Sequence, residues 1–285
     1  RAMHPDLKKD IKNLNALSIE KKYELIGFSN LLDENKKIKI PENISQIKID
    51  IGLSFSAPNA SLWLCETDDR MVFGFEPSPF CTASLVKGIG GRNGIGEHQA
   101  AMCIGEGVIY KNNEIVESEI NNRFTLVQCA LDDVGKHNPQ FMTFYQTLGD
   151  PGCSSLSMPT DKLISDAKRN EEGAMGVTGV GVISFYDFLE KIPWDRFDFI
   201  EQVKIDTQGR DLNILKSSEE YLQKIVFLQV ENSTNGEYED SHTKEEIHQF
   251  LIDNDFKHIY TIDVDSSYIN SKYFHLIDKL HNSVV

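Results

Sequence analysis

The chain has 285 residues, of which 40% are hydrophobic and 26% are charged, and these values are typical of a globular protein in water. A formal net charge of −15 argues against nucleic acid or an anionic membrane surface as a partner, because both are themselves negatively charged. Five scattered cysteines without a C-x-x-C pair favour a reducing compartment. No apolar run reaches the roughly 20 residues of a membrane span, and no signal peptide follows Met3, so we expect a cytoplasmic protein without membrane insertion.

Residues 1–40 are predicted to form an N-terminal helical extension, and residues 41–285 to form the main domain. The extension is rich in lysine and can present one apolar face to the domain, built from Leu14, Leu17, Leu25 and Ile26. Such charged helices more often have a structural role than a role in substrate binding. Arg1 and Ala2, which precede Met3, are typical of a cloning remnant or of the cut edge of a longer protein.

A βαβ unit is predicted over residues 44–79. Its strand, helix and strand are Ile47–Ile51, Asn59–Glu66 and Met71–Phe75. The turn after the first strand begins with Gly52 and continues with small residues, which lets a ligand approach the backbone. The second strand ends at Glu76, before Pro77, and an acid at this position can accept hydrogen bonds from both hydroxyls of a ribose. The unit therefore predicts a ligand that contains a nucleoside.

The same turn indicates which nucleoside is bound. A dinucleotide fold carries G-x-G-x-x-G here, so that backbone N–H groups hold a pyrophosphate, but Gly52–Ala57 keeps only the first glycine. A ligand without phosphates, such as S-adenosylmethionine, needs a carboxylate near its cationic end, a close glycine and an acid for the ribose, which Asp50, Gly52 and Glu76 supply. An NAD(P)-dependent oxidoreductase, a non-catalytic nucleoside-binding module and an ordinary βα turn remain as alternatives.

Residues 88–120 are predicted to be an insertion between the second and third strands. Gly88–Gly96 holds five glycines, but their spacing matches no phosphate-binding loop and no apolar strand precedes them, so a surface loop is expected. The segment Gly107–Glu117 predicts a β-hairpin with two asparagines at its turn.

Strands and helices alternate along the rest of the chain as far as Val264. Phe124–Ala130 is the predicted third strand, with Leu131 and Asp132 after it, and an adenine can stack at the end of this strand. The later elements are a short strand Phe141–Tyr145, an extended edge segment Gly173–Val182, a helix capped by Ser184, a strand Phe199–Ile205, a helix Asp211–Lys224, a strand Ile225–Val230, a helix with a capping box at Thr243 and Glu246, and a strand His258–Val264. The alternation predicts an α/β, doubly wound sheet with helices on both faces.

Five motifs in this order make the chain resemble the FkbM-type family of S-adenosylmethionine-dependent methyltransferases, from about Ile47 to Val264. They are Ile49-Asp50-Ile51-Gly52, Gly74-Phe75-Glu76-Pro77, Ala130-Leu131-Asp132-Asp133, Ser154-Ser155-Leu156, and Lys204-Ile205-Asp206-Thr207-Gln208-Gly209-Arg210-Asp211 followed by Gln229-Val230-Glu231. Two positions depart from the family pattern. The first turn lacks the usual Ala-Asn and second glycine, and Gln208 stands where an acid is common.

The resemblance implies a Rossmann-like methyltransferase sheet and methyl transfer from S-adenosylmethionine to a hydroxyl, often on a sugar or glycan. The cofactor-binding residues that it implies are Asp50, Gly52, Ser54, Glu76, Pro77, Ala130, Leu131 and Asp132. The acceptor itself and the oligomeric state are not implied.

Two acids are the candidate catalytic residues. Asp206 and Glu231 end the fourth and fifth strands, which a doubly wound topology places beside the first, and ligands bind at these carboxyl ends. Asp206 is the expected general base and Glu231 its partner or a ligand of the acceptor. No metal is required by this scheme, but if a divalent cation such as Mg²⁺ or Mn²⁺ takes part, Asp206, Asp211 and Glu231 are its expected ligands.

Overall fold

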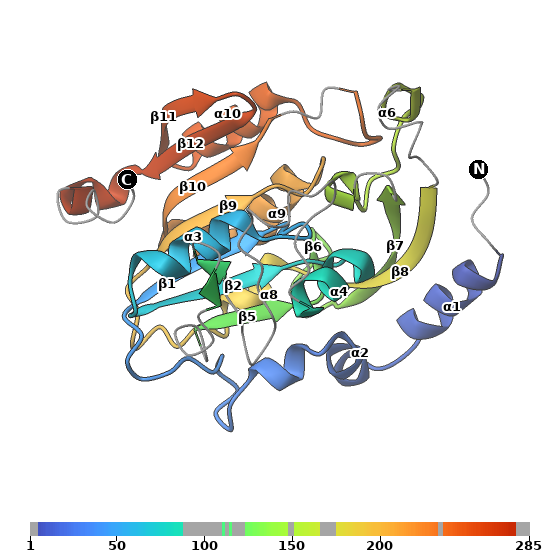
Figure 1. Cartoon of the computed structure of the whole chain (residues 1–285), viewed down its shortest axis with the longest axis horizontal. Coiled ribbons are helices and arrows are strands. Elements are labelled where there is room, and N and C mark those ends of the chain that lie inside the picture. Colours follow the sequence, from blue (N-terminus) through green and yellow to red (C-terminus); the bar gives the residue numbers. More distant parts are fainter. Residues whose placement is uncertain are drawn as a thin grey trace.

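A seven-stranded, mainly parallel sheet forms the centre of the computed structural model, which describes residues 5–87, 110–111, 114–115, 123–147, 151–165, 175–232 and 236–277. The strand order is β11-β12-β10-β9-β1-β2-β5 (Figure 1). The strands are β1 (Gln46–Ile51), β2 (Arg70–Phe75), β5 (Phe124–Val127), β9 (Ile200–Ile205), β10 (Ile225–Glu231), β11 (Phe256–Ile262) and β12 (Asp265–Asn270). Strand β12 is the one strand of this sheet that runs opposite to the others, so it pairs antiparallel with both β10 and β11. This sheet confirms the predicted fold class.

The order of the strands reverses at β1. Strand β1 pairs in parallel with β2 on one side and with β9 on the other, so the chain builds the sheet outward in both directions from this strand. The carboxyl ends of β1, β2 and β9 therefore meet at one edge, where doubly wound folds bind ligands. Strand β1 forms because its β-branched residues fill the core on alternate positions, and Ile47, Ile49 and Ile51 are all fully buried.

Helices cover both faces of the sheet. The helix α3 (Pro58–Glu66) lies on one face with α4 (Pro79–Lys87), where Trp63 packs in the core. The other face carries α8 (Phe185–Leu189), α9 (Asp211–Ser217) and α10 (Lys244–Asp253). Ser184 caps α8, and the predicted capping box of Thr243 and Glu246 begins α10.

A second sheet has the order β6-β8-β7, and its strands are β6 (Ala130–Leu131), β7 (Gln140–Thr147) and β8 (Met175–Ile183). Two predictions were wrong here. Phe124–Ala130 is not one strand, because the chain turns after Val127 and Ala130 joins the second sheet. The described part of the predicted edge segment Gly173–Val182, from Met175 onward, is not at an edge either, since β8 is the central strand.

The glycines of β8 do not mark an exposed edge of the sheet. They make room for helices to pack on the face of this strand. A Cβ atom on Gly181 would lie 2.4 Å from Ile26 Cγ1, and one on Gly179 would lie 3.4 Å from Ile11 Cγ1. Isolated glycines weaken a strand when they face solvent, but here their missing side chains let two helices approach the sheet.

Those helices belong to the N-terminal extension, which contains α1 (Pro5–Asn15), α2 (Ile19–Ile26) and the 3₁₀ helix η1 (Phe28–Leu31). Figure 1 shows α1 and α2 beneath β7 and β8. The predicted apolar face is only partly right, because Leu17 and Leu25 are 38% and 49% exposed whereas Ile26 is buried. Asn15 adds a polar contact. Its side-chain amide donates to the carbonyl oxygen of Phe141 on β7 at 2.9 Å, and its side-chain oxygen accepts from Phe141 N at 2.7 Å.

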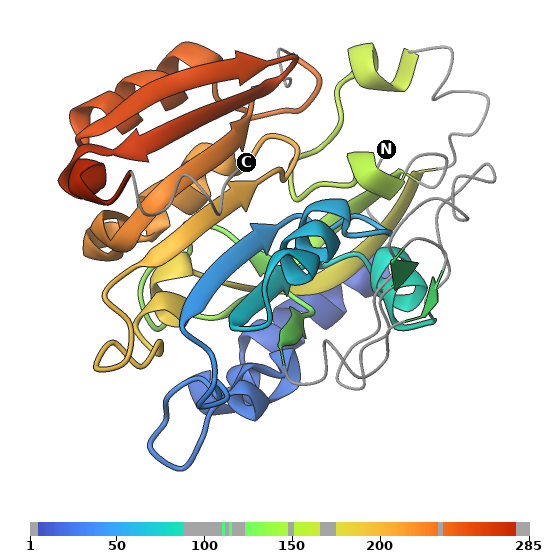
Figure 2. The same cartoon turned by 60° about the vertical axis from the view of Figure 1, so that its left-hand side comes forward.

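The C-terminal part differs from the prediction in two details. Strand β12 was not predicted, and it forms an antiparallel hairpin with β11 at the far end of the sheet from the N-terminal helices (Figure 2). The predicted helix Asp211–Lys224 breaks into α9 and the 3₁₀ helix η4 (Glu219–Lys224), because Glu219 has a positive φ of 52°. The other short helices in the described residues are η3 (Pro151–Cys153), α6 (Asp161–Ser165) and η5 (Ser271–Leu276).

Within the predicted insertion, β3 (Tyr110–Lys111) and β4 (Glu114–Ile115) pair antiparallel, as the hairpin prediction requires. The glycine-rich segment Gly88–Gly96 lies outside the described residues.

Candidate active site

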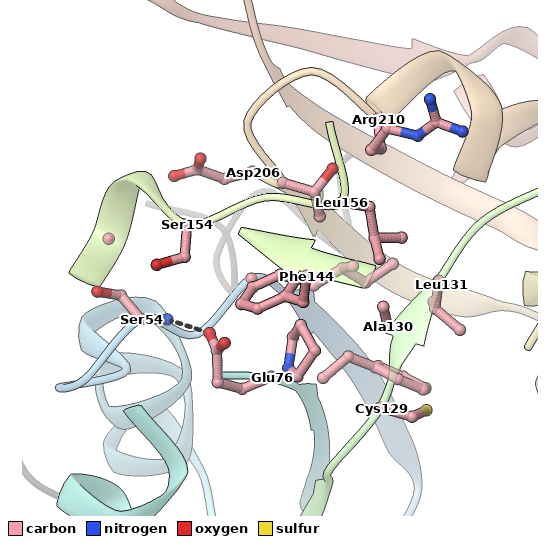
Figure 3. A pocket seen from close by; sticks show the side chains of 16 residues that line it. Ser54, Glu76, Cys129, Ala130, Leu131, Phe144, Ser154, Leu156, Asp206 and Arg210 are labelled. Carbon is pink, nitrogen blue, oxygen red and sulfur yellow. Dashed lines mark hydrogen bonds between the residues drawn. The ribbon is translucent and has the colours of Figure 1, made fainter. Parts of the chain in front are cut away.

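A pocket of about 580 Å³, including its open mouth, lies at the carboxyl ends of β1, β2 and β9. One wall belongs to the second sheet and to the segment after η3. Figure 3 shows Phe144 at the centre of the pocket, with Ser54 and Glu76 below it and Asp206 above. The residues that line it are Ile51, Gly52, Ser54, Phe75, Glu76, Pro77, Cys129, Ala130, Leu131, Phe144, Gly152, Ser154, Leu156, Asp206, Thr207 and Arg210.

Gly52 brings the β1 turn into contact with the end of β9. Its φ is +89°, and a Cβ atom at this position would lie 1.9 Å from the carbonyl oxygen of Asp206. The turn is held by a hydrogen bond from Gly52 N to the carbonyl oxygen of Phe75 at 2.9 Å, and Asp206 N donates to that of Ile51 at 2.9 Å. Only glycine fits between the two backbones, so this residue sets the floor of the pocket.

Glu76 is the buried acid of the pocket. Ser54 N donates to its Oε2 at 2.8 Å and Ser78 N donates to its Oε1 at 2.9 Å. Burial raises the pKa of Glu76 to about 7, although these two backbone donors act to lower it. Each carboxylate oxygen has a second lone pair, so Glu76 can still accept hydrogen bonds from a ligand.

Asp206 lies across the pocket from Glu76, and its side chain is 30% exposed. The Lys204 ammonium is 3.2 Å from Asp206 Oδ2 and 4.0 Å from Asp50 Oδ1. Desolvation acts to raise the pKa of Asp206, but Lys204 and the surrounding hydrogen bonds hold it below its ordinary value. Asp206 is therefore ionised at neutral pH and open to the pocket.

The methyltransferase FkbM domain model matches residues 43–258, which is more than half of the chain. The chain belongs to the FkbM methyltransferase family. This match confirms the resemblance drawn from the five motifs. A comparison with curated proteins finds no match. None of the helices in the described part of this FkbM protein has the length and apolar character needed to cross a membrane.

Seven of the residues predicted from the sequence meet at the FkbM pocket, namely Gly52, Ser54, Glu76, Pro77, Ala130, Leu131 and Asp206. The other three do not line it. Asp50 is buried behind the pocket, where its Oδ2 accepts a hydrogen bond from Ala60 N on α3. Asp132 is buried and its Oδ2 accepts from Arg210 Nη2 at 2.5 Å. Glu231 reaches the site through Gln208, whose Nε2 lies 2.8 Å from Glu231 Oε2 and 2.9 Å from Asp206 Oδ1.

The three acids predicted to bind a divalent cation if one takes part, Asp206, Asp211 and Glu231, do not converge on one point in the FkbM site. Asp211 Oδ1 accepts hydrogen bonds from the backbone N and the hydroxyl of Thr207, and its Oδ2 accepts from Glu231 N. It thus ties the β9 turn to β10 rather than facing the pocket. In the part of the chain that the structure describes, no group of three His, Cys, Asp or Glu side chains is arranged to hold a metal ion.

Sequence reasoning missed Phe144, Cys129, Arg210 and Ser154 as pocket residues. Phe144 lies on the predicted strand Phe141–Tyr145, but no local pattern shows that this strand approaches the ends of β1 and β2. Ser154 stands in one of the five quoted motifs, which is the signal that could have identified it. Trp194 stacks on Tyr221 and does not line the pocket.

We expect the ligand-free protein to lose stability as the pH rises from about 5 to about 8. Burial raises the pKa of Asp50 to about 6, of Glu76 to about 7 and of Asp211 to about 6. A carboxyl whose pKa is raised on folding stabilises the fold below its unfolded pKa, and this contribution is lost as the pH rises through the folded pKa. The melting temperature at pH 8 should be lower by about 5 °C or more than at pH 5.

Thermal unfolding followed by circular dichroism measures this dependence. Glu76→Gln should reduce the fall between pH 6 and pH 8, whereas Glu34→Gln at an exposed position should leave it unchanged. A melting temperature that rises between pH 5 and pH 8 would contradict the inference that burial raises the pKa of these carboxyls.

Proposed function

We propose that this FkbM methyltransferase transfers the methyl group of S-adenosylmethionine to a hydroxyl group, and that its acceptor is a sugar or glycan in the cytoplasm. The observation that carries the proposal is the pairing of the Gly52 turn with the buried Glu76 carboxylate at the point where the strand order reverses. This arrangement provides a backbone surface without a side chain and an acid for a ribose, and it has no glycine set for a pyrophosphate.

The pocket fits an adenosyl group on two further counts. Ala130 and Leu131 present apolar surface beside the buried ring of Phe144, which suits a flat, weakly polar base. Glu76 keeps one lone pair on each oxygen, as the two ribose hydroxyls require. In this proposal Asp50 acts indirectly by holding the start of α3 through Ala60 N, and Asp132 acts by holding Arg210. S-adenosylmethionine supplies an electrophilic methyl group on sulfur when it is bound.

Asp206 is proposed to accept the proton of the acceptor hydroxyl. An oxygen that gains a methyl group becomes strongly acidic, so even a carboxylate of low pKa can take its proton in the transition state. Asp206 faces the pocket and is ionised at neutral pH, and it is therefore suited to orient the hydroxyl as well. The carboxylates at this edge favour a neutral acceptor such as a sugar over an anionic one.

The cofactor role is tested by replacing Glu76. We expect Glu76→Ala to weaken the binding of S-adenosylhomocysteine about 10²- to 10⁴-fold, because two hydrogen bonds to a charged group, each of about 1.5–3 kcal/mol, are lost. Isothermal titration calorimetry measures the affinity and circular dichroism checks the fold. Glu34→Ala, at an exposed position outside the pocket, is the matched control and should bind normally.

A thermal-shift comparison of S-adenosylhomocysteine with NAD and NADP distinguishes a methyltransferase from an NAD(P)-dependent oxidoreductase. Stabilisation of the wild-type protein by S-adenosylhomocysteine alone supports the proposal, since a ligand that binds only the folded state raises the melting temperature. Stabilisation by NAD or NADP alone would replace it with an oxidoreductase. Unchanged affinity in Glu76→Ala would remove this residue from the ribose site.

A further inference from the structure

Gln208 joins the two carboxylates at the carboxyl ends of β9 and β10. Its amide nitrogen is 2.9 Å from Asp206 Oδ1 and 2.8 Å from Glu231 Oε2, so it donates one hydrogen to each acid. The opposite orientation of the amide would place its oxygen against both carboxylates, which is unfavourable. The two acids therefore determine the orientation of the amide.

The amide oxygen of Gln208 faces a third group. The Tyr238 hydroxyl lies 3.2 Å from Gln208 Oε1 and 2.7 Å from the carbonyl oxygen of Cys153, so its hydrogen can point to either acceptor. Tyr238 is only 2% exposed, and it packs against Gly209, where an added Cβ atom would lie 3.3 Å from Tyr238 Cβ. Gln208 is thus held from both ends of its amide.

The backbone of Gln208 is held as well. Its φ is +56°, a left-handed conformation that residues other than glycine seldom adopt. The Ser155 hydroxyl donates to the carbonyl oxygen of Gln208 at 2.8 Å, and Ser157 N donates to the Ser155 hydroxyl at 2.9 Å. A residue kept in an unfavourable conformation by several contacts is often kept there for function.

We propose that Gln208 is a positioning residue that holds Asp206 and Glu231 side by side at the acceptor side of the pocket by donating one amide hydrogen to each. The proposal rests on the proposed methyl transfer for the purpose of the pair, but the arrangement itself can be tested without an acceptor. Asp206 then takes the hydroxyl proton, and Glu231 can accept a hydrogen bond from a second hydroxyl of the same sugar.

The charges around the pair show what the uncharged amide of Gln208 contributes. Two adjacent carboxylates repel each other, and one of them normally binds a proton unless donors or cations compensate. Lys204 compensates from the Asp206 side, a hydrogen bond between the Asp206 and Glu231 side chains lowers the pKa of Asp206 further, and Gln208 donates from the side that the two acids share. The titratable groups that face Asp206 are Asp50 on β1, Glu76 directly after β2, Lys204 on β9, Asp211 at the start of α9, Glu231 on β10 and Asp265 on β12.

The test is a carboxyl titration by ¹³C NMR in a buffer with EDTA, using protein labelled at the side-chain carboxyls of aspartate and glutamate. Loss of one signal in Asp206→Asn and of another in Glu231→Gln identifies the pair. In Gln208→Glu, a third carboxylate replaces the shared donor, so the pKa of Asp206 or Glu231 should rise by about one unit or more. Gln249→Glu, which adds a carboxylate beside Asp253 on the exposed face of α10, is the control and should shift neither signal.

Gln208→Asn covers the case in which Gln208→Glu does not fold. It adds no charge, but its shorter side chain cannot donate to both acids, so the pKa of at least one of them should still rise. Values within about 0.3 units of the wild type in both variants would overturn the proposal.

Calorimetry with S-adenosylhomocysteine separates this proposal from the proposed function. Gln208 does not line the pocket, so Gln208→Glu should bind S-adenosylhomocysteine within about threefold of the wild type. A loss of more than tenfold would show that Gln208 shapes the cofactor site instead of the acid pair. If the wild type fails to bind this ligand, the cofactor assignment fails, while the carboxyl titration still decides the role of Gln208.

Discussion

Gly52→Ala is expected to abolish measurable binding of S-adenosylhomocysteine and to lower the free energy of unfolding by about 4 kcal/mol. The added Cβ atom would lie 1.9 Å from the carbonyl oxygen of Asp206, and neither atom can move alone, because both belong to backbone at the junction of β1 and β9. The turn and the end of β9 must separate, which displaces Asp206 and the floor of the pocket together. Urea denaturation and calorimetry measure the two effects.

Gly27→Ala is the matched control. Gly27 has a φ of +87°, almost equal to that of Gly52, but nothing lies within 4 Å of its added Cβ atom. This variant carries the backbone penalty alone, about 1 kcal/mol, and should bind S-adenosylhomocysteine normally. Equal destabilisation in the two variants would contradict the close approach of the β1 turn to β9.

Asp206→Asn is expected to lower turnover by about 10²- to 10⁴-fold while the affinity for S-adenosylhomocysteine changes by less than about threefold. The amide keeps the shape of the side chain, but it cannot accept the hydroxyl proton. Transfer of a radiolabelled methyl group from S-adenosylmethionine to a panel of sugars measures the turnover. Asp195→Asn, on an exposed loop, serves as the control. Activity within tenfold of the wild type would remove Asp206 from the role of base.

The parts of the fold that the sequence predicts are those set by local pattern. Strand β1, helix α3 and strand β2 follow one another within 30 residues, and each contains its own signal of β-branched or helix-forming residues. The capping boundaries of α8 and α10 were also predicted correctly, because a cap needs only neighbouring residues.

The second sheet could not be predicted in the same way. Ala130 pairs with Val182 on β8, which is 52 residues away in the chain, and this pairing decides that the third strand ends at Val127. The glycines of β8 indicate a weak strand locally, but they are explained by Ile11 and Ile26 from the far end of the chain. Phe144 is brought to the pocket by the same long-range pairing.

The positions of the candidate site residues along the sheet were easier to predict than the contacts of their side chains. Glu76 and Asp206 could be placed at strand ends, where topology brings ligands. Asp211 shows the limit of this reasoning, because a motif does not reveal whether a carboxylate is free or already accepts hydrogen bonds from Thr207 and Glu231. Asp132 was likewise assigned to the cofactor, but it forms an ion pair with Arg210.

The contact between Asn15 and Phe141 has a consequence for attempts to isolate the main domain. Strand β7 is an outer strand of its sheet, and the amide of Asn15 occupies backbone groups of Phe141 that would otherwise be free to pair with another chain. An uncovered strand edge is a template for intermolecular association. A fragment of residues 41–285 would expose this edge, together with the surface of β8 around Gly179 and Gly181 that Ile11 and Ile26 cover. We expect such a fragment to aggregate. The N-terminal helices therefore protect the second sheet, which forms one wall of the pocket, from association with other chains.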